Sequence, residues 1–293
     1  KVDLKNENGQ NSLHIASEKG MLAVVEKLIE KRADVNIPDN DGRAPLTIAC
    51  TDGHADVALA LLEDDNIKVD LTITFNALLD LVYTKKMFAV IDKLIAKKAD
   101  VNVRDNSGNT ALIQACTENH AYVALALLER EDIKVDLINN GGATALHHAS
   151  RNGMIEVVEK LIVKGANVNI QDRIHEYTAL MIACMKKHAD IALALLENDN
   201  IEVDLENEFD GTALHMAADK GMLAVVKKLI EKDADVNIQD NFRETALMIA
   251  IKNRHTDVAL ALLEHEDIVV NFKNKSGDTA LHLAVRLGRL EIV

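Results

Sequence analysis

The sequence predicts an all-α repeat solenoid, a stack of helix-turn-helix repeats, and three observations support this class. First, a five-residue motif built on one leucine recurs nine times along the 293 residues. Second, the copies are evenly spaced, since Leu13 and Leu46 are 33 residues apart and Leu112 and Leu146 are 34 apart. Third, apolar residues follow the motif at helical spacing. The anchoring leucines are Leu13, Leu46, Leu79, Leu112, Leu146, Leu180, Leu214, Leu247 and Leu281.

The fifth copy shows the elements of one repeat in order. Thr144 is suited to cap a first helix, because its hydroxyl can accept a backbone N–H, and Gly153 stops that helix. A second helix is expected over about 155–163, where apolar residues recur on one side. Gly165 can end it in the left-handed conformation, and 166–172 leads out in β-branched residues towards a turn. Two helices this short bury a core only when they stack on similar neighbours.

These features resemble a known family. The period, the "TALHHA" of 144–149 and the "ADVNIQD" of 234–240 resemble ankyrin repeats, and the resemblance covers essentially the whole chain. It implies an L-shaped repeat of two antiparallel helices with a short β-hairpin finger. It also implies a curved array whose concave face carries the fingers and the first helices. The function that the resemblance implies is non-enzymatic: the binding of another protein.

We expect residues 1–293 to form a single ankyrin-repeat solenoid of about nine repeats, the last of them truncated. The stretch "VDLKNENG" at 2–9 matches the tail of an even-numbered copy, and "LEIV" at 290–293 stops inside a second helix. Neither end carries the polar capping repeat that a solenoid normally uses. The sequence is therefore interpreted as part of a longer array.

The copies alternate between two types. Odd copies place His in the motif and Met before the second helix, whereas even copies place Thr, Ile or Met in the motif and His before the second helix. An ancestor of two repeats, about 67 residues long, accounts for this pattern. The third copy departs from both types, with Asp80 and Val82 in the motif and no glycine in 72–76, so an altered finger is expected there. The alternating histidines are His14, His147, His215 and His282 in odd copies and His54, His120, His188 and His255 in even copies.

Charge also alternates after the second helices. Even copies are followed by acidic runs, at 63–66, 129–132, 197–200 and 264–267. Odd copies place bases there instead. A solvated edge explains this pattern, because exposed ion pairs contribute only about 0–1 kcal/mol. The alternative is that opposite charges help to fix which repeat follows which. The bases are Lys31, Arg32, Lys97, Lys98, Lys164 and Lys232.

The net charge and the cysteines restrict the partner and the compartment. There are 47 acidic and 33 basic residues, a formal net charge of −14. Nucleic acid is a poor partner for such a chain, since phosphates need clustered Lys and Arg, and a protein with a basic surface suits it better. Apolar runs such as 57–62 end far short of the ~18 residues of a membrane span, so no membrane insertion is expected. Three widely spaced cysteines indicate a reducing, cytoplasmic compartment.

Cys184 and His188 are four residues apart, a spacing that two metal ligands on one helix face could use. A related pair stands at Ile251 and His255, with isoleucine in the place of the thiol. An apolar residue can replace a packing neighbour but cannot replace a ligand. We therefore interpret the cysteines as small core residues and the histidines as ordering the start of the second helix, and we expect no metal, no cofactor and no enzyme activity. The other pairs are Cys50 with His54 and Cys116 with His120.

The rare aromatic residues point to the binding site. Only eight occur in the chain, and three of them lie at predicted finger tips, where Asp, Asn and Gly are usual. Two of these tips replace the usual glycine with His175 and Arg243. Exposed aromatic and arginine side chains are typical of protein–protein hot spots, although a tip aromatic can also simply pack on the next finger. The predicted partner-binding residues are Arg173, Ile174, His175, Tyr177, Phe209, Phe242 and Arg243.

Two functions remain open at this point. The first is a protein-interaction module that binds its partner with fingers and first helices, chiefly between the fifth and eighth repeats. The second is the targeting or regulatory arm of a larger enzyme, effector or channel. The resemblance also implies that asparagines before the odd-to-even turns can be hydroxylation targets, although a structural role in the hairpin is favoured. These are Asn36, Asn102, Asn169 and Asn237.

Overall fold

The computed structural model describes residues 2–69, 85–97, 100–289 and 291–292. The chain divides into two compact units, Lys1–Lys134 and Val135–Val293, which we call the N-terminal and C-terminal units and describe separately. Within the described residues, all regular secondary structure is helical, so the predicted all-α repeat solenoid is confirmed.

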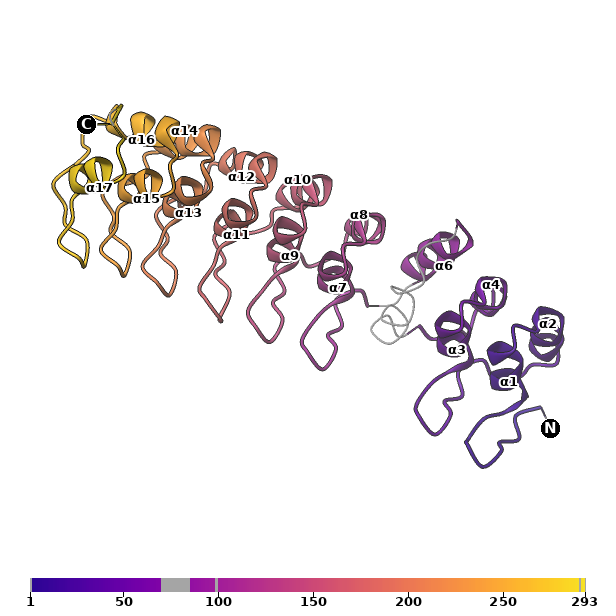
Figure 1. The fold of residues 1–293 in the computed structure, drawn as a ribbon. Helices are drawn as coiled ribbons and strands as arrows, with labels where there is room; N and C mark the ends of the chain where they lie inside the picture. Colours follow the sequence, from indigo (N-terminus) through magenta and orange to yellow (C-terminus); the bar gives the residue numbers. More distant parts are fainter. Residues whose placement is uncertain (1, 70–84, 98–99, 290, 293) are drawn as a thin grey trace. The chain divides into compact units, whose positions relative to one another are not determined.

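In the N-terminal unit, the described helices of the first, second and fourth repeats come as pairs of a first and a second helix, and α6 (Lys85–Ala96) is the described second helix of the third repeat. The second helices form one layer, the first helices form the next, and the fingers extend from the first helices (Figure 1). The first helices are α1 (Ser12–Glu18), α3 (Pro45–Thr51) and α7 (Ala111–Thr117); the second helices are α2 (Leu22–Glu30), α4 (Ala55–Leu62), α6 (Lys85–Ala96) and α8 (Ala121–Leu128).

The C-terminal unit repeats these three layers. Its first helices pack side by side, as do its second helices, so each repeat covers the apolar face of the one before it. The first helices are α9 (Ala145–Arg151), α11 (Ala179–Lys186), α13 (Ala213–Lys220), α15 (Ala246–Lys252) and α17 (Ala280–Arg286); the second helices are α10 (Ile155–Val163), α12 (Ala189–Leu196), α14 (Leu223–Glu231) and α16 (Thr256–Leu263).

Eight of the nine predicted motifs coincide with a described first helix. The third motif and its expected altered finger at 72–76 lie outside the described residues, so the count of nine and the single solenoid stay predictions. Motif leucines such as Leu13 and Leu146 are at most 1% exposed, whereas Leu281 of α17 is 55% exposed. Burying one such side chain stabilises the fold by about 1.5–3 kcal/mol, which short helices need because they are marginal in isolation.

The fingers differ from the prediction in one respect. Among the described residues they contain no β-strand; each is a turn closed at its tip by an Asp or Asn. In the finger of the second repeat the Asp39 backbone N–H donates to Arg43 O at 2.9 Å. The Asp39 carboxylate in turn accepts the N–H groups of Asp41 and Arg43. These local bonds satisfy the backbone, so no strand ladder is required.

The motif histidine of an odd repeat reaches the next repeat. His147 Nδ1 accepts the backbone N–H of Thr144 at 3.2 Å, which confirms Thr144 as the N-cap and leaves the ring proton on Nε2. Nε2 then donates to Tyr177 O, in the finger of the sixth repeat, at 3.1 Å. In the seventh repeat, His215 Nε2 lies 3.1 Å from Ile238 O and 3.2 Å from Glu244 O. The motif histidines of the fifth and seventh repeats therefore fix the backbone of the following even finger, whereas Nε2 of His14 in the first repeat is buried without a hydrogen-bond partner in the described part of the chain.

The asparagine after each odd second helix forms a second link in the same direction. Asn237 Nδ2 donates to Asp267 O at 2.9 Å, while Asn237 Oδ1 accepts the Val269 N–H at 2.8 Å. At the even-to-odd step the corresponding residue is an aspartate: Asp204 only accepts, from the Asp235 N–H at 3.1 Å. A carboxylate has no proton to donate. The even-to-odd step therefore has one donor bonded to Asp204, whereas the odd-to-even step has two bonds at Asn237. The same two bonds form at Asn36, Asn102 and Asn169.

The histidine before the second helix is the third link in the second, sixth and eighth repeats. His255 occupies the N-cap position of α16, as predicted for these histidines, and its Nε2 donates to Asp219 O at the end of α13 at 3.0 Å. Its ring lies against Gly221, where an added Cβ would come within 2.4 Å of the ring. His54 against Gly20 and His188 against Gly153 repeat the arrangement. Glycine in the odd repeat and histidine in the even repeat are therefore complementary.

Side-chain ion pairs contribute at the even-to-odd step. Glu197 pairs with Lys228 of α14 at 2.9 Å, and Glu63 pairs with Lys93 of α6. The acidic runs after even repeats thus contact the following odd repeat. In these two pairs the partners are lysines within its second helix; of the predicted loop bases, Lys97 donates to the backbone oxygen of Asp64 at 3.3 Å. These glutamates are exposed, so each pair contributes about 0–1 kcal/mol.

The asparagine link predicts asymmetric effects of two opposite substitutions. Asn237→Asp removes the donor to Asp267 O and sets a carboxylate against that carbonyl, so the free energy of unfolding should fall by about 1–3 kcal/mol. The control Asp204→Asn keeps its acceptor oxygen and should change stability by less than about 0.5 kcal/mol. Urea unfolding followed by circular dichroism checks both. Equal losses in the two variants would contradict the asymmetry.

Stability is predicted to fall in mild acid. Burial lowers the pKa of His147 and His215, and for His148 on α9 burial, reinforced by the Arg151 charge, lowers the pKa to about 4. In the unfolded chain these histidines take up protons near pH 6.5, whereas in the folded chain they stay neutral at that pH. Their contribution to the free energy of unfolding is therefore fully present above pH 6.5 and is lost as the pH falls below it. At pH 5 the loss from His148 alone is about 2 kcal/mol. Urea midpoints at pH 7.5 and 5 measure this, and His148→Gln should reduce the difference; an unchanged difference would contradict the assignment to His148.

Candidate functional site

The finger of the sixth repeat, 172–178, is one residue longer than the other fingers that the structure describes. The Asp172 backbone N–H donates to Tyr177 O at 3.0 Å, across five residues instead of four. The Asp172 carboxylate accepts the N–H groups of Ile174 at 3.1 Å and His175 at 2.8 Å. This tip projects His175 and Ile174 into solvent, while Tyr177 stays half-buried beside the first helix.

The prediction that His175 replaces the tip glycine is wrong. The left-handed residue of the sixth finger is Glu176, with φ of 57°, because the extra residue moves that position along the chain. The eighth finger agrees with the prediction, since Arg243 has φ of 59°. In the seventh finger Asp210, with φ of 56°, also takes the place of the tip glycine, which was not predicted. The next residue is Gly211, so the sequence of this finger still contains a glycine.

Successive fingers of the C-terminal unit are joined by single backbone hydrogen bonds. The Glu208 N–H donates to His175 O at 3.1 Å, the Asn241 N–H to Phe209 O at 2.9 Å and the Lys275 N–H to Phe242 O at 3.0 Å. These bonds hold the tips in register. Residues at corresponding tip positions are therefore presented in a row.

The three predicted tip aromatics meet in one cavity of about 400 Å³. Tyr177, Phe209 and Phe242 line it from the fingers, and apolar side chains of the first helices line it from the other side. Phe209 is 44% exposed and Phe242 is 60% exposed, so both remain available to a partner. The helix side chains are Met185 of α11, Met216 of α13 and Ile249 of α15.

The other predicted tip residues lie differently. Arg173 and Ile174 turn to the fifth finger, where a Cβ at Gly142 would lie 2.6 Å from Arg173 Cγ and one at Gly141 would lie 3.3 Å from Ile174 Cδ1. Neither residue lines the cavity, and Arg243 does not line it either. Packing on the fifth finger thus partly accounts for the placement of Arg173 and Ile174 at the tip, although Ile174 remains 64% exposed.

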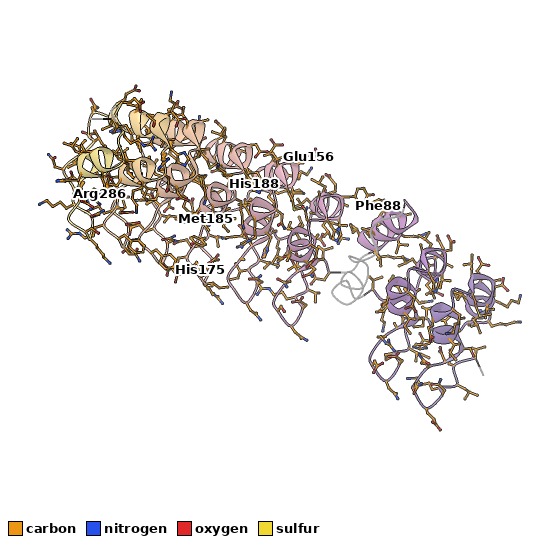
Figure 2. All side chains as sticks on the ribbon, in the orientation of Figure 1. Phe88, Glu156, His175, Met185, His188 and Arg286 are labelled. Carbon is orange, nitrogen blue, oxygen red and sulfur yellow. The ribbon has the colours of Figure 1, made fainter. Side chains whose placement is uncertain are left out.

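A second cavity, of about 220 Å³, adjoins the first. His175 and Tyr177 line it from the sixth finger, and Tyr177 and Met185 are shared with the larger cavity. Figure 2 shows His175 on the finger and Met185 on the first helix of the same repeat. The His175 ring is 5.4 Å from the Tyr177 ring and 6.5 Å from the Phe209 ring, so it bridges two fingers. We call the two cavities together the finger groove; its remaining lining includes Arg151, Ile182 and Lys186.

The first helices were expected to take part in binding, but the individual residues on the helix side of the groove were not predicted, because Met185 and Met216 are not aromatic. A signal was present: Met216 and Ile249 occupy the variable position of the motif, between the His or Met and the Ala, which faces the fingers. Large apolar side chains at that position in successive repeats predict an apolar floor.

The carboxylates that line the larger cavity are already paired. Glu244 binds Lys252 at 2.7 Å, and Asp219 accepts from Asn253 Nδ2 at 2.6 Å. Asp240 accepts the N–H groups of Phe242 and Glu244 in its own finger. These groups are therefore structural, and what the groove offers chemically is apolar surface with a polar rim.

Cys184 and its counterparts lie in the core. Cys50, Cys116 and Cys184 are completely buried, and burial raises the pKa of each thiol to about 12, so the reactive thiolate is not formed at neutral pH. Within the ranges that the structure describes, His, Cys, Asp and Glu side chains do not gather in a group of three or more that could hold a metal ion. Among the described helices, none is both long enough and apolar enough to cross a bilayer.

The asparagines considered for hydroxylation lie away from the groove. Asn36, Asn102, Asn169 and Asn237 are the residues that link odd repeats to even repeats, through both the oxygen and the nitrogen of each side-chain amide. These bonds favour the structural role. Hydroxylation itself stays a prediction.

Known proteins provide independent evidence of the family. A family model described as ankyrin repeats matches residues 1–73, 78–172, 173–240 and 214–293. The E3 ubiquitin-protein ligase KEG of Arabidopsis thaliana is 24% identical over 340 aligned residues, which cover 95% of this chain and 20% of that protein. The ankyrin repeat and KH domain-containing protein mask-1 of Caenorhabditis elegans is 30% identical over 308, which cover 99% of this chain and 11% of that protein.

A solved structure agrees with these matches. The ankyrin repeat protein EF0377 superposes with a TM-score of 0.57 at 28% sequence identity, covering 67% of this chain and 96% of that one. The chain spans a fifth or less of the length of the two relatives named above. The repeat period, the described helices and these matches agree, and the chain belongs to the ankyrin repeat family.

Proposed function

We propose that this chain is a non-enzymatic interaction module that binds a partner protein in the finger groove. Ankyrin repeats are protein-interaction modules, and the proposal assigns that role here to the C-terminal unit. The observation that carries it is the meeting of Tyr177, Phe209 and Phe242 with Met185 and Met216 around one open cavity.

Two physical arguments support the groove as the contact surface. Exposed aromatic rings are unfavourable in water, and Tyr, Phe and Met are enriched where proteins bind one another. The finger backbones on which Tyr177 and Phe242 stand are fixed by the hydrogen bonds of His147 and His215. A rigid set of rings loses little conformational entropy on binding, which favours affinity.

A second function is the targeting or regulatory arm of a larger protein. The relatives support this alternative, because one is a ubiquitin ligase and the aligned chain makes up only 20% of it. In that arrangement the groove would select what the remainder of the protein acts on. A reducing, cytoplasmic compartment, a scaffold role and a partner with a basic surface remain parts of the proposal rather than findings.

Truncation of two groove aromatics tests the proposal. Peptides are first selected from a random 16-residue display library on the immobilised 293-residue chain, and their affinities are measured by fluorescence anisotropy. Tyr177→Ala combined with Phe242→Ala should weaken the selected peptides by at least about tenfold, because two central rings are lost from the interface.

The matched control is Tyr122→Ala, which removes a comparably exposed ring outside the groove, in the N-terminal unit. It should leave the affinities unchanged, and circular dichroism should show that both variants keep the helical content of the unmodified chain. Peptides that bind the groove variant as tightly as they bind the unmodified chain would refute the proposed site.

A further inference from the structure

The two ends of the finger groove differ in charge. The smaller cavity, at the α9–α11 end, is lined by Arg151, Lys186 and His175; its described lining contains no carboxylate, although the Glu208 carboxylate of the next finger pairs with the His175 ring. The larger cavity, towards α15, is lined by Asp219, Asp240 and Glu244 as well as by two lysines. A peptide that follows the groove therefore meets cations without neighbouring carboxylates in the lining at the α9–α11 end, and cations mixed with carboxylates at the other end.

Two of these groups, Arg151 and Lys186, differ from the lysines at the other end in having no paired carboxylate within the described part of the chain. Lys252 and Lys220, which line the other end, pair with Glu244 and Asp219. Arg151 and Lys186, by contrast, form no ion pair with any other residue that the structure describes. Both side chains are exposed at the rim, next to the apolar surfaces of Ile182 and Met185. Apolar walls beside an unpaired charge lower the local dielectric and strengthen its attraction for an anion.

The larger cavity contains a polar group without a partner. The Asn241 Oδ1 atom is buried and accepts no hydrogen bond within the described part of the chain. Asn241 lines the cavity between Phe209 and Phe242. A buried acceptor left unpaired is costly, and a backbone N–H of an extended chain in the cavity satisfies it once the Asn241 side chain rotates to expose this oxygen.

We propose that the finger groove binds an extended peptide segment whose apolar side chains enter the cavity between Phe209 and Phe242 and whose Asp or Glu side chain pairs with Arg151 and Lys186. This inference rests on the proposed function. Corresponding positions in successive repeats are about 10 Å apart, so the two sites are separated by about 20 Å. An extended chain covers that span in about six residues.

The net charge of −14 does not argue against an acidic ligand. Much of the acidic excess lies in the runs that follow the even second helices, such as 197–200 and 264–267, outside the groove lining. Long-range charge affects how fast a ligand arrives and is screened within about 10 Å at ordinary salt. Local pairing at Arg151 and Lys186 decides which ligand stays bound.

The experiment uses the peptides selected on the intact 293-residue chain. Their sequences should share apolar residues with an Asp or Glu about six positions away. Arg151→Glu combined with Lys186→Glu should weaken them by at least about tenfold. Replacing the acidic residue of a peptide by Lys should restore binding to this reversed variant and abolish binding to the unmodified chain.

The control reverses two exposed cations outside the groove, Lys227→Glu with Arg254→Glu, and should leave the affinities unchanged. Peptides that depend on Tyr177 and Phe242 but not on Arg151 and Lys186 would overturn the acidic ligand while leaving the proposed function intact. The affinity of a fluorescein-labelled oligothymidylate of 20 nucleotides is measured in the same assay, as a probe of nucleic-acid binding. Tighter binding of that oligonucleotide than of the selected peptides would overturn the assignment of a peptide ligand.

Discussion

The polar bonds that an odd repeat makes with the even repeat after it are the constraint on which the rest of this structure depends. Three side chains supply them: the motif His, the Asn after the odd second helix, and the His before the even second helix. Each of these side chains bonds to backbone groups of the neighbouring repeat. The bonds therefore do not depend on which side chains that neighbouring repeat carries. Apolar packing between helices carries most of the stability, but it is not directional. The polar bonds define how far one repeat is rotated and displaced from the next.

The finger groove depends on these bonds because it uses fingers that they hold. Tyr177 stands on the sixth finger, whose backbone accepts from His147, and Phe242 stands on the eighth finger, whose backbone accepts from His215. The seventh finger, which carries Phe209, follows an even repeat with Met181 in the motif, and an apolar side chain cannot form the corresponding bond. Its register comes instead from bonds to the neighbouring fingers: Glu208 N–H donates to His175 O, the Glu208 carboxylate pairs with the His175 ring, and Phe209 O accepts the Asn241 N–H. The groove thus combines two fingers fixed by histidines with one held by finger-to-finger bonds.

The sequence predicted the features that depend on residues near one another in the chain. Motif leucines and glycines marked the helices, Thr144 was identified as a cap, and the Cys–His spacing was recognised as packing because Ile251 replaces one thiol. What it did not predict depends on contacts about 30 residues apart. Whether a tip side chain such as Ile174 faces the groove or the preceding finger is decided by Gly141, in another repeat. The apolar floor of Met185 and Met216 forms only after the first helices stack, and Glu176 takes the left-handed position because of one extra residue in a turn.

The alternation also explains why the repeats occur as pairs. Asn can donate and accept, so it suits a step with two backbone partners, whereas Asp at the even-to-odd step meets one donor only. Native-state hydrogen exchange tests this account most directly, because it measures which helices open together. The account predicts that α9–α12 of the C-terminal unit share one opening free energy and that α13–α16 share another. Helices α11–α14 opening as one group, with α9 and α10 opening separately, would contradict it.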